Sequence, residues 1–215
     1  ASGVPIAKHG NRSVSSKSGS ADVLAALGCN LDMPHTAHEE ALRSYCFSFL
    51  FAPKHHEAMK HAVSARQSLK LRTIFNLLGP LSNPAGAKRQ LLGVYSPVWL
   101  EPMAEVLKAL GAEHVWVVHG SDGLDELTVT GPSIVSEMKE GRITRFEVTP
   151  ESVGLKRHAL EALKGGDAGE NAAALKDVLA GKHSAYRDIV LLNAGAAIVV
   201  GGKADTLASG VQQAM

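Results

Sequence analysis

Short apolar runs alternate with polar and glycine-rich stretches in the first third of the chain. Residues 4–7 are apolar and lead into a polar loop, after which residues 21–27 place apolar side chains at helical spacing. We expect a strand, a loop and a helix here. The spacing predicts a second helix over residues 36–50, and the break at Pro53 precedes a third helical pattern over residues 57–69.

The middle of the chain predicts two buried strands around a helix. Apolar runs at residues 90–95 and 114–120 predict the strands, and residues 99–110 predict the helix between them. Short connections of this kind indicate a right-handed parallel strand–helix–strand unit. The alternating runs at residues 133–138 and 142–148 are joined by a glycine-containing link, which predicts an antiparallel hairpin.

Two apolar segments near the end complete the pattern. Residues 171–179 predict a helix after a Gly-Gly-Asp loop, and the compact run at residues 189–194 predicts another buried strand. Strands that alternate with helices are typical of the α/β class.

Composition indicates an ordinary globular chain. Of its 215 residues, 45% are hydrophobic and 20% are charged, and the formal net charge of +1 does not supply the broad basic surface of a nucleic-acid-binding protein. No apolar run reaches the length of about 18–20 residues that a membrane span needs, and the start has no signal-peptide pattern, so we expect a cytoplasmic protein. Cys29 and Cys46 lie outside any metal-binding spacing, and we expect both to be buried free thiols.

The loop over residues 8–20 concentrates positive charge and hydroxyl groups. It contains Lys8, Arg12 and Lys17, with two glycines and five serines. Glycines let backbone N–H groups approach an oxyanion, and Lys and Arg side chains neutralise its charge, so we predict a ligand that carries phosphate. The alternative is a polar surface loop whose Ser20 simply caps the following helix.

A pair of carboxylates, Asp125 and Glu126, follows the strand predicted at residues 114–120. The carboxyl ends of parallel strands are where open α/β sheets bind ligands. Adjacent carboxylates suit Mg²⁺, which takes one or two of them together with substrate phosphates and water. The alternative is a solvated acidic pair with no ligand.

Several motifs resemble those of the anthranilate phosphoribosyltransferase family. The opening Lys-His-Gly-Asn-Arg run and its Ser-Ser-x-Ser-Gly continuation resemble the family's phosphoribosyl diphosphate loop, whereas the related pyrimidine nucleoside phosphorylases typically lack Asn after Gly. The other matching segments are Phe-Ala-Pro ending at Pro53, Asn-Leu-Leu-Gly-Pro-Leu-x-Asn-Pro over residues 76–84, Gly-Leu-Asp-Glu-Leu over 123–127, Gly-Gly-Asp over 165–167 and Leu-Asn-Ala-Gly-Ala over 192–196.

The resemblance implies one α/β catalytic domain over residues 1–215, of the nucleoside phosphorylase and phosphoribosyltransferase type, with a mixed, mostly parallel sheet flanked by helices. It implies transfer of the phosphoribosyl group of 5-phosphoribosyl 1-diphosphate to the amine of anthranilate, with Mg²⁺ as cofactor and a homodimer as the assembly. The family's N-terminal helical segment, its Gly-Thr-Gly-Gly-Asp turn and its C-terminal helix have no counterpart here. We therefore expect these residues alone to bind diphosphate poorly and to be inactive.

The resemblance also assigns roles to individual residues. The phosphoribosyl diphosphate-binding set lies in the opening segment: Lys8, His9, Gly10, Asn11, Arg12, Ser13, Val14, Ser15, Ser16 and Ser20. The anthranilate-binding set is Asn11, Pro53, His56, Met59 and Arg66, although the family often has Tyr in place of Met59, and the metal-binding pair is Asp125 and Glu126. Arg66 suits the anthranilate carboxylate because a guanidinium binds a carboxylate through two hydrogen bonds, but it can equally be a helix-surface arginine.

Two other functions remain open at this stage. A pyrimidine nucleoside phosphorylase of related fold is disfavoured by Asn11 and by the pair Asp125 and Glu126. A non-catalytic relative that binds nucleic acid requires a broad basic stripe, which the near-neutral net charge does not supply.

Overall fold

The computed structural model describes residues 2–12, 17–56 and 74–215, except for the side chains of residues 75 and 76. The helix predicted over residues 57–69 lies outside these ranges.

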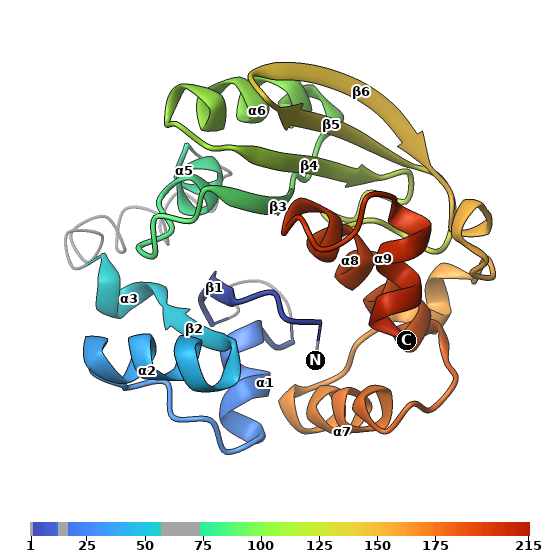
Figure 1. Cartoon of the computed structure of the whole chain (residues 1–215). Coiled ribbons are helices and arrows are strands. Elements are labelled where there is room, and N and C mark those ends of the chain that lie inside the picture. Colours follow the sequence, from blue (N-terminus) through green and yellow to red (C-terminus); the bar gives the residue numbers. More distant parts are fainter. Residues whose placement is uncertain (1, 13–16, 57–73) are drawn as a thin grey trace. The chain divides into compact units, whose positions relative to one another are not determined.

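Contacts within the chain divide it into two compact units, which are described separately (Figure 1). The smaller unit comprises Pro5–Ala87 and Gly165–Leu175, and the larger unit comprises Ala1–Val4, Lys88–Lys164 and Lys176–Met215. The expectation of one catalytic domain over the whole chain stays a prediction.

Among the described residues, two parallel strands form the sheet of the smaller unit. β1 (Ile6–Gly10) pairs with β2 (Phe47–Phe51) along its whole length, so that Gly10 lies opposite Phe51. The strand predicted at residues 4–7 therefore continues into what was expected to be loop. Before residue 87, the described residues of this unit form the helices α1 (Ser20–Ala26), α2 (His35–Tyr45), α3 (Ala52–His55) and α5 (Phe75–Leu81).

The helix predicted over residues 36–50 is wrong in its second part. α2 ends at Tyr45, and Cys46 has a left-handed φ of 56°, which turns the chain into β2. Phe49, which lies in that second part, is buried in the strand. A short apolar run fits a buried strand as well as a helix, so periodicity alone does not separate the two.

The sheet of the larger unit has four strands in the order β3-β4-β5-β6. Its strands are β3 (Arg89–Gly93), β4 (His114–Gly120), β5 (Ser133–Lys139) and β6 (Arg142–Val148), and α6 (Leu100–Ala109) connects the first two. β3 and β4 are parallel, whereas β4 with β5 and β5 with β6 are antiparallel. The predicted parallel pairing and the predicted hairpin are both confirmed.

The mixed α/β fold class is confirmed. Within the described residues, the pairings β1 with β2 and β3 with β4 are parallel, and the other two pairings are antiparallel. The balance is thus even in this part of the chain, where a mostly parallel sheet was expected.

Helices and short 3₁₀ turns make up the rest of the larger unit. They are η2 (Pro97–Trp99), η3 (Pro150–Val153), η4 (Leu160–Leu163), α8 (Ala185–Val200) and α9 (Leu207–Ala214), and α7 (Ala168–Leu179) runs from the smaller unit into the larger. None of the helices in the described ranges is long and apolar enough to cross a membrane.

The prediction of a strand at residues 189–194 is wrong, because the run lies inside α8. The Oγ of Ser184 accepts the N–H of Arg187 and caps the start of this helix. A short apolar run fits a helix buried on several sides as well as a buried strand. Here the helix begins at Ala185, before the apolar run, and Ser184 is its N-cap.

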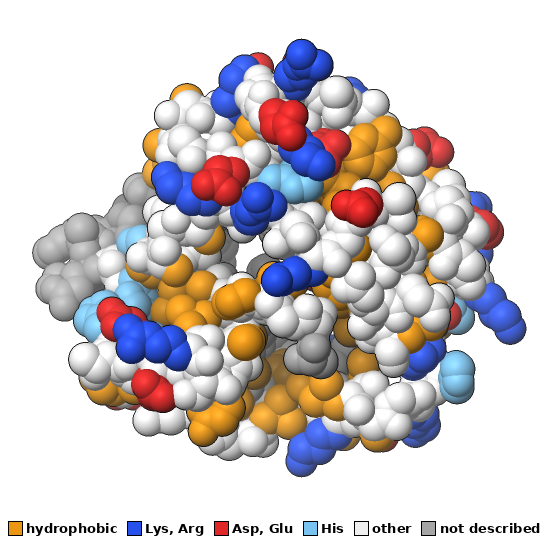
Figure 2. Space-filling model, in the orientation of Figure 1, with side chains coloured by type: hydrophobic (Ala, Val, Ile, Leu, Met, Phe, Trp, Pro, Cys, Tyr) orange, Lys and Arg blue, Asp and Glu red, His pale blue; other side chains and the backbone are white. Residues whose placement is uncertain are grey.

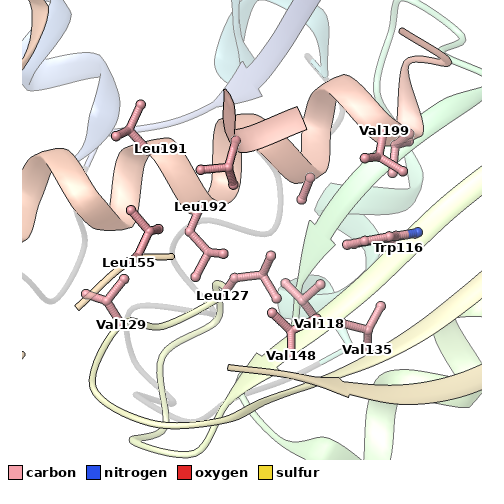
Figure 3. Packing of buried hydrophobic residues seen from close by; sticks show 13 residues of the cluster. Trp116, Val118, Leu127, Val129, Val135, Val148, Leu155, Leu191, Leu192 and Val199 are labelled. Atoms are coloured by element: carbon pink, nitrogen blue, oxygen red, sulfur yellow. The ribbon is translucent and has the colours of Figure 1, made fainter. Parts of the chain in front are cut away.

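One apolar cluster joins α8 to the sheet of the larger unit. Figure 3 shows Leu192 of α8 facing the same interior as Val118 of β4 and the loop residue Leu127. These three side chains are at most 1% exposed. Burial of a side chain of this size contributes about 1.5–3 kcal/mol, so the loop after β4 is anchored in the core.

The two cysteines are free, and Cys29 is exposed while Cys46 is partly buried. The prediction of two buried thiols is wrong for Cys29. The residue follows Gly28, whose φ of 87° turns the chain after α1, so the thiol lies beyond the packed face of that helix.

α8 and α9 approach each other closely at a glycine. A Cβ atom at Gly195 would lie 2.6 Å from Cγ2 of Val211 and 2.7 Å from its backbone nitrogen. Because backbone atoms cannot move aside alone, this contact fixes the distance between the two helices.

Substitution Gly195→Ala should lower the free energy of unfolding by about 1–3 kcal/mol, because overpacking forces the two helices apart. The control is Gly169→Ala inside α7, where a new Cβ would have its nearest neighbour at 3.4 Å. Ala is the better helix former, so the control should be neutral or stabilising. Urea unfolding of the complete polypeptide measures both, and equal effects at the two sites would contradict this account of the packing.

Candidate functional site

The carboxyl ends of β1 and β2 lie next to each other in the smaller unit. The strands are parallel and Gly10 lies opposite Phe51, so the segments that follow them leave from the same edge. Asn11 follows the first strand and is exposed, and Pro53 lies in α3 after the second. This is the edge at which α/β sheets bind ligands.

Gly10 permits β1 to end against the start of α1. A Cβ atom at this position would lie 2.9 Å from the ring of Phe49 and 2.9 Å from Oγ of Ser20. The structure therefore brings together two members of the predicted diphosphate-binding set, Gly10 and Ser20. Ser20 is the first residue of α1 and not its cap, because Gly19 occupies the N-cap position.

Arg12 is held in place but remains accessible. Its Nη1 lies 3.3 Å from Oδ1 of Asp22, its guanidinium carbon lies 5.9 Å from the centre of the Phe51 ring, and its side chain is 60% exposed. The other carboxylate oxygen of Asp22 accepts the N–H of Gly19 at 2.9 Å. Arg12, just after β1, and the exposed Lys8, in the middle of that strand, thus provide two cations in this part of the smaller unit.

His9 and His56 share a hydrogen bond at the same edge. Their Nε2 atoms are 3.1 Å apart, and the rings meet edge to face. A neutral imidazole has one N–H donor, so one ring donates and the other accepts, and the bond is lost when both rings carry two protons. Histidine side chains also reach the surface over α2 and α3 in this unit (Figure 2).

Burial lowers the pKa of His9 below its usual value. The imidazole of His56 lowers this pKa further, a hydrogen bond with the Gly79 backbone opposes the shift, and His55 adds a small decrease. A lowered pKa keeps the His9 ring neutral at pH 7. The folded state disfavours the protonated ring, so the pair is most stable above the usual His pKa and loses stability as the pH falls below it.

Substitution His56→Ala should raise the pKa of His9, because the second-largest cause of its depression is removed. The pKa should stay below that of a free imidazole, since burial persists. NMR titration of the His9 ring in the complete polypeptide measures the shift. His183→Ala, at an exposed position of the larger unit, is the control and should leave this pKa unchanged.

Asn171 was not predicted as a site residue, yet it connects two loops of the smaller unit. Its Nδ2 donates to Oγ of Ser18 at 2.7 Å, and its Oδ1 accepts the N–H of Gly166 at 2.9 Å. The Gly-Gly-Asp loop is thereby joined to the serine-rich loop more than a hundred residues away. The motif was visible in the sequence, but its partner could be identified only in three dimensions.

Asp125 and Glu126 lie in the larger unit, in the loop after β4. Both side chains are exposed. A Cβ atom at Gly93, the last residue of β3, would lie 1.5 Å from the carbonyl oxygen of Asp125. The absence of a side chain at Gly93 therefore lets the acidic loop rest directly on the carboxyl end of β3.

The acidic pair fits a partly coordinated Mg²⁺. Two neighbouring carboxylates offer the oxygen ligands that this ion prefers. Within the described ranges, no group of three or more His, Cys, Asp or Glu residues could hold a metal ion. Two carboxylates fill only part of the coordination shell of Mg²⁺, which usually completes it with substrate phosphates and water.

Asp122 stabilises the loop that carries this pair. Its Oδ2 accepts the hydroxyls of Thr128 at 2.6 Å and Thr130 at 2.7 Å, and its Oδ1 accepts the N–H of Leu124 at 3.1 Å. Burial acts to raise the pKa of Asp122, but these three hydrogen bonds outweigh it and hold the pKa below its usual value.

Substitution Thr130→Val should destabilise the protein by about 1.5–3 kcal/mol near pH 7, the value of a hydrogen bond to a charged group. A depressed carboxylate pKa contributes stability above the usual Asp pKa of about 4, and this contribution disappears as the pH falls through the lowered value. The difference from the parent protein should therefore shrink in acid. Urea unfolding near pH 7 and at a pH below the usual Asp pKa tests this, with the substitution Thr144→Val at an exposed position of β6 as control. A difference in unfolding free energy that does not change with pH would contradict the assignment.

Six predicted site residues lie outside the described residues. They are Ser13, Val14, Ser15, Ser16, Met59 and Arg66. Of the remainder, the structure brings Lys8, His9, Gly10, Asn11, Arg12, Ser20, Pro53 and His56 into the smaller unit, and Asp125 and Glu126 into the larger. The roles of all these residues stay predictions.

Comparison with known protein families gives the class to which this α/β chain belongs. The family model described as "Glycosyl transferase family, a/b domain" matches residues 1–215. The chain belongs to this family.

Its relatives are more specific. The chain is 60% identical over 214 residues to the anthranilate phosphoribosyltransferase of Paramagnetospirillum magneticum, covering 100% of the chain and 62% of that relative. It is similar to the crystal structure of anthranilate phosphoribosyltransferase from Thermus thermophilus, with a TM-score of 0.92, 50% identity and coverage of 99% and 63%. The enzyme from Saccharomyces cerevisiae in complex with PRPP and Mg gives a TM-score of 0.87, 30% identity and coverage of 99% and 61%.

These matches confirm the resemblance to anthranilate phosphoribosyltransferases that the motifs predicted. The chain spans a little over three fifths of the length of the relatives that it matches. What those longer proteins do is therefore transferred to this chain only as a proposal.

Proposed function

We propose that this chain carries the phosphoribosyl-transfer machinery of an anthranilate phosphoribosyltransferase. The reaction moves the phosphoribosyl group of 5-phosphoribosyl 1-diphosphate to the amine of anthranilate, as the second step of tryptophan biosynthesis from chorismate. The observation that carries the proposal is similarity over the full length of the chain, at 60% identity to a relative of that name. The proposal includes Mg²⁺, a homodimer and a cytoplasmic location, with no nucleic-acid partner.

The charge that develops on the substrate during the reaction decides which protein groups are needed to stabilise it. The bond between ribose C1 and the diphosphate oxygen breaks, so negative charge grows on the leaving group while the sugar gains oxocarbenium character. The anthranilate amine forms a bond to C1 and loses a proton. Fixed cations that match the growing charge supply much of the rate acceleration in such a step.

The opening segment is proposed to bind the diphosphate. Lys8 lies within β1 and Arg12 follows it, both with exposed side chains, and Gly10 lets Ser20 lie directly against the end of the strand. Ser13, Val14, Ser15 and Ser16 complete the proposed set. Mg²⁺ on Asp125 and Glu126 would neutralise the charge of the leaving diphosphate.

The residues at the ends of β1 and β2 are proposed to bind the acceptor, anthranilate. The end of β1 carries His9 and Asn11, and the segment after β2 carries Pro53 and His56. The imidazole of His9, which shares a hydrogen bond with His56, is neutral at pH 7 because its pKa is lowered. A neutral His9 ring can hydrogen-bond an amine that must remain unprotonated to attack. Arg66 and Met59 complete the proposed acceptor set, with Arg66 binding the carboxylate.

The test follows the fall of anthranilate fluorescence with 5-phosphoribosyl 1-diphosphate and Mg²⁺, using the complete polypeptide. Asp125→Asn should lower kcat/KM by about 10²–10³-fold, as expected when one electrostatic contact to developing charge is lost. Arg66→Ala should mainly raise KM for anthranilate. Glu147→Gln, an exposed carboxylate on β6, is the matched control and should have no effect.

A double variant tests whether both the acidic pair and the cationic loop act on one diphosphate. If they do, Lys8→Ala and Asp125→Asn should couple, with a combined effect that differs from the sum by about 0.5–3 kcal/mol. Strictly additive effects would contradict a shared substrate. Phosphorolysis of uridine or thymidine without use of anthranilate would replace the proposal by the nucleoside phosphorylase alternative.

A further inference from the structure

The side chain of Asn193, in the middle of α8, hydrogen-bonds the backbone of a distant loop residue. Its Oδ1 accepts the N–H of Leu127 at 3.0 Å, and its Nδ2 donates to the Leu127 carbonyl at 2.8 Å. The second N–H of the amide donates to the carbonyl of Ile189 at 2.9 Å, one turn earlier in the helix. Both donors and the acceptor oxygen are in use, which fixes the rotamer of the amide.

Leu127 is the residue directly after the acidic pair, and it is fixed in two ways. Its side chain is 0% exposed and lies in the core beside Leu192 and Val118 (Figure 3). Its backbone N–H and C=O are both held by one amide, as they would be by a neighbouring strand. A lateral shift of the chain at Leu127 breaks both hydrogen bonds together.

The other side of the acidic pair is held as well. The carbonyl of Asp125 rests on the Cα of Gly93, and Asp122 accepts hydrogen bonds from Thr128 and Thr130 across the loop. The backbone is therefore fixed on both sides of two carboxylates whose own side chains are exposed. The position of this backbone therefore affects where those carboxylates lie.

We propose that Asn193 is a positioning residue for Asp125 and Glu126, and that its amide sets the divalent-cation affinity of this loop. The inference rests on the proposed function, because it needs the acidic pair to bind Mg²⁺. Partners that orient metal ligands without touching the metal typically affect metal affinity or activity by about 10–100-fold. Asn193 acts in this way through the main chain of Leu127.

Two substitutions test the role by different physical routes. Asn193→Leu keeps the approximate size and removes all three hydrogen bonds. Asn193→Asp keeps the acceptor for the Leu127 N–H but places an oxygen against the carbonyls of Leu127 and Ile189. Its added negative charge, by itself, would strengthen binding of a cation, so weaker binding by this variant identifies loss of geometry and not loss of charge.

The measurement is Mn²⁺ binding by EPR, with the complete polypeptide and 5-phosphoribosyl 1-diphosphate and without anthranilate. The Mn²⁺ affinity of both variants should be lower than that of the parent by about tenfold or more. The KM for anthranilate should not change. Val200→Ala on the same helix is the control: Val200 is 2% exposed, so the substitution lowers stability, but the Mn²⁺ affinity should remain that of the parent.

The outcomes separate the inference from the function on which it rests. If Asp125→Asn weakens Mn²⁺ binding and the Asn193 variants do not, Asn193 is only structural and the inference is overturned. If Val200→Ala weakens binding as much as the Asn193 variants do, the effect follows stability and the inference is again overturned. If Asp125→Asn itself has no effect, the metal assignment is wrong, and the positioning role falls with it.

Discussion

Close approach of main chain to main chain at the ends of two strands is the constraint on which both parts of the candidate site depend. β1 ends at Gly10 and β3 ends at Gly93, and each glycine contacts a segment that carries functional groups. At Gly10 a side chain would collide with Ser20 and the ring of Phe49, and at Gly93 it would overlap the carbonyl of Asp125. Any larger residue would push the functional segment away from its strand.

Two asparagine side chains also hold the loops of the candidate site in place through hydrogen bonds. Asn171 links two loops of the smaller unit, and Asn193 links a helix to a loop of the larger unit. A carboxamide is suited to this because it presents a donor and an acceptor in one plane, matching the N–H and C=O of a peptide. Loops without strand partners thereby obtain hydrogen bonds that a sheet would otherwise supply, at a net contribution of about 0.5–1.5 kcal/mol each.

The parts predictable from sequence were those decided by local pattern. The helix over residues 99–110, the strand at 114–120 and the hairpin that follows have long or strongly alternating patterns, and each was found close to its place. The motif-bearing loops could also be recognised, since glycine, lysine and paired carboxylates are informative where they cluster. The errors fell on short apolar runs, at residues 47–51 and 189–194, where burial on both sides removes the periodicity that separates strand from helix.

Long-range partners could not be predicted in the same way. Nothing near Asn193 in the sequence indicates Leu127, because the contact depends on how α8 packs against the loop after β4. Likewise, the hydrogen bond between His9 and His56 depends on the register of two parallel strands. Such contacts require the fold first, and chemistry that acts through them is found only after it.

The division of the chain into two units has a practical spectroscopic consequence. Both cysteines, Cys29 and Cys46, belong to the smaller unit, and both tryptophans, Trp99 and Trp116, belong to the larger. The exposed thiol of Cys29 can accept a fluorescent label, while indole emission reports on the other unit without any modification. Each half thus has its own optical reporter, and energy transfer from indole to label would follow their separation in solution.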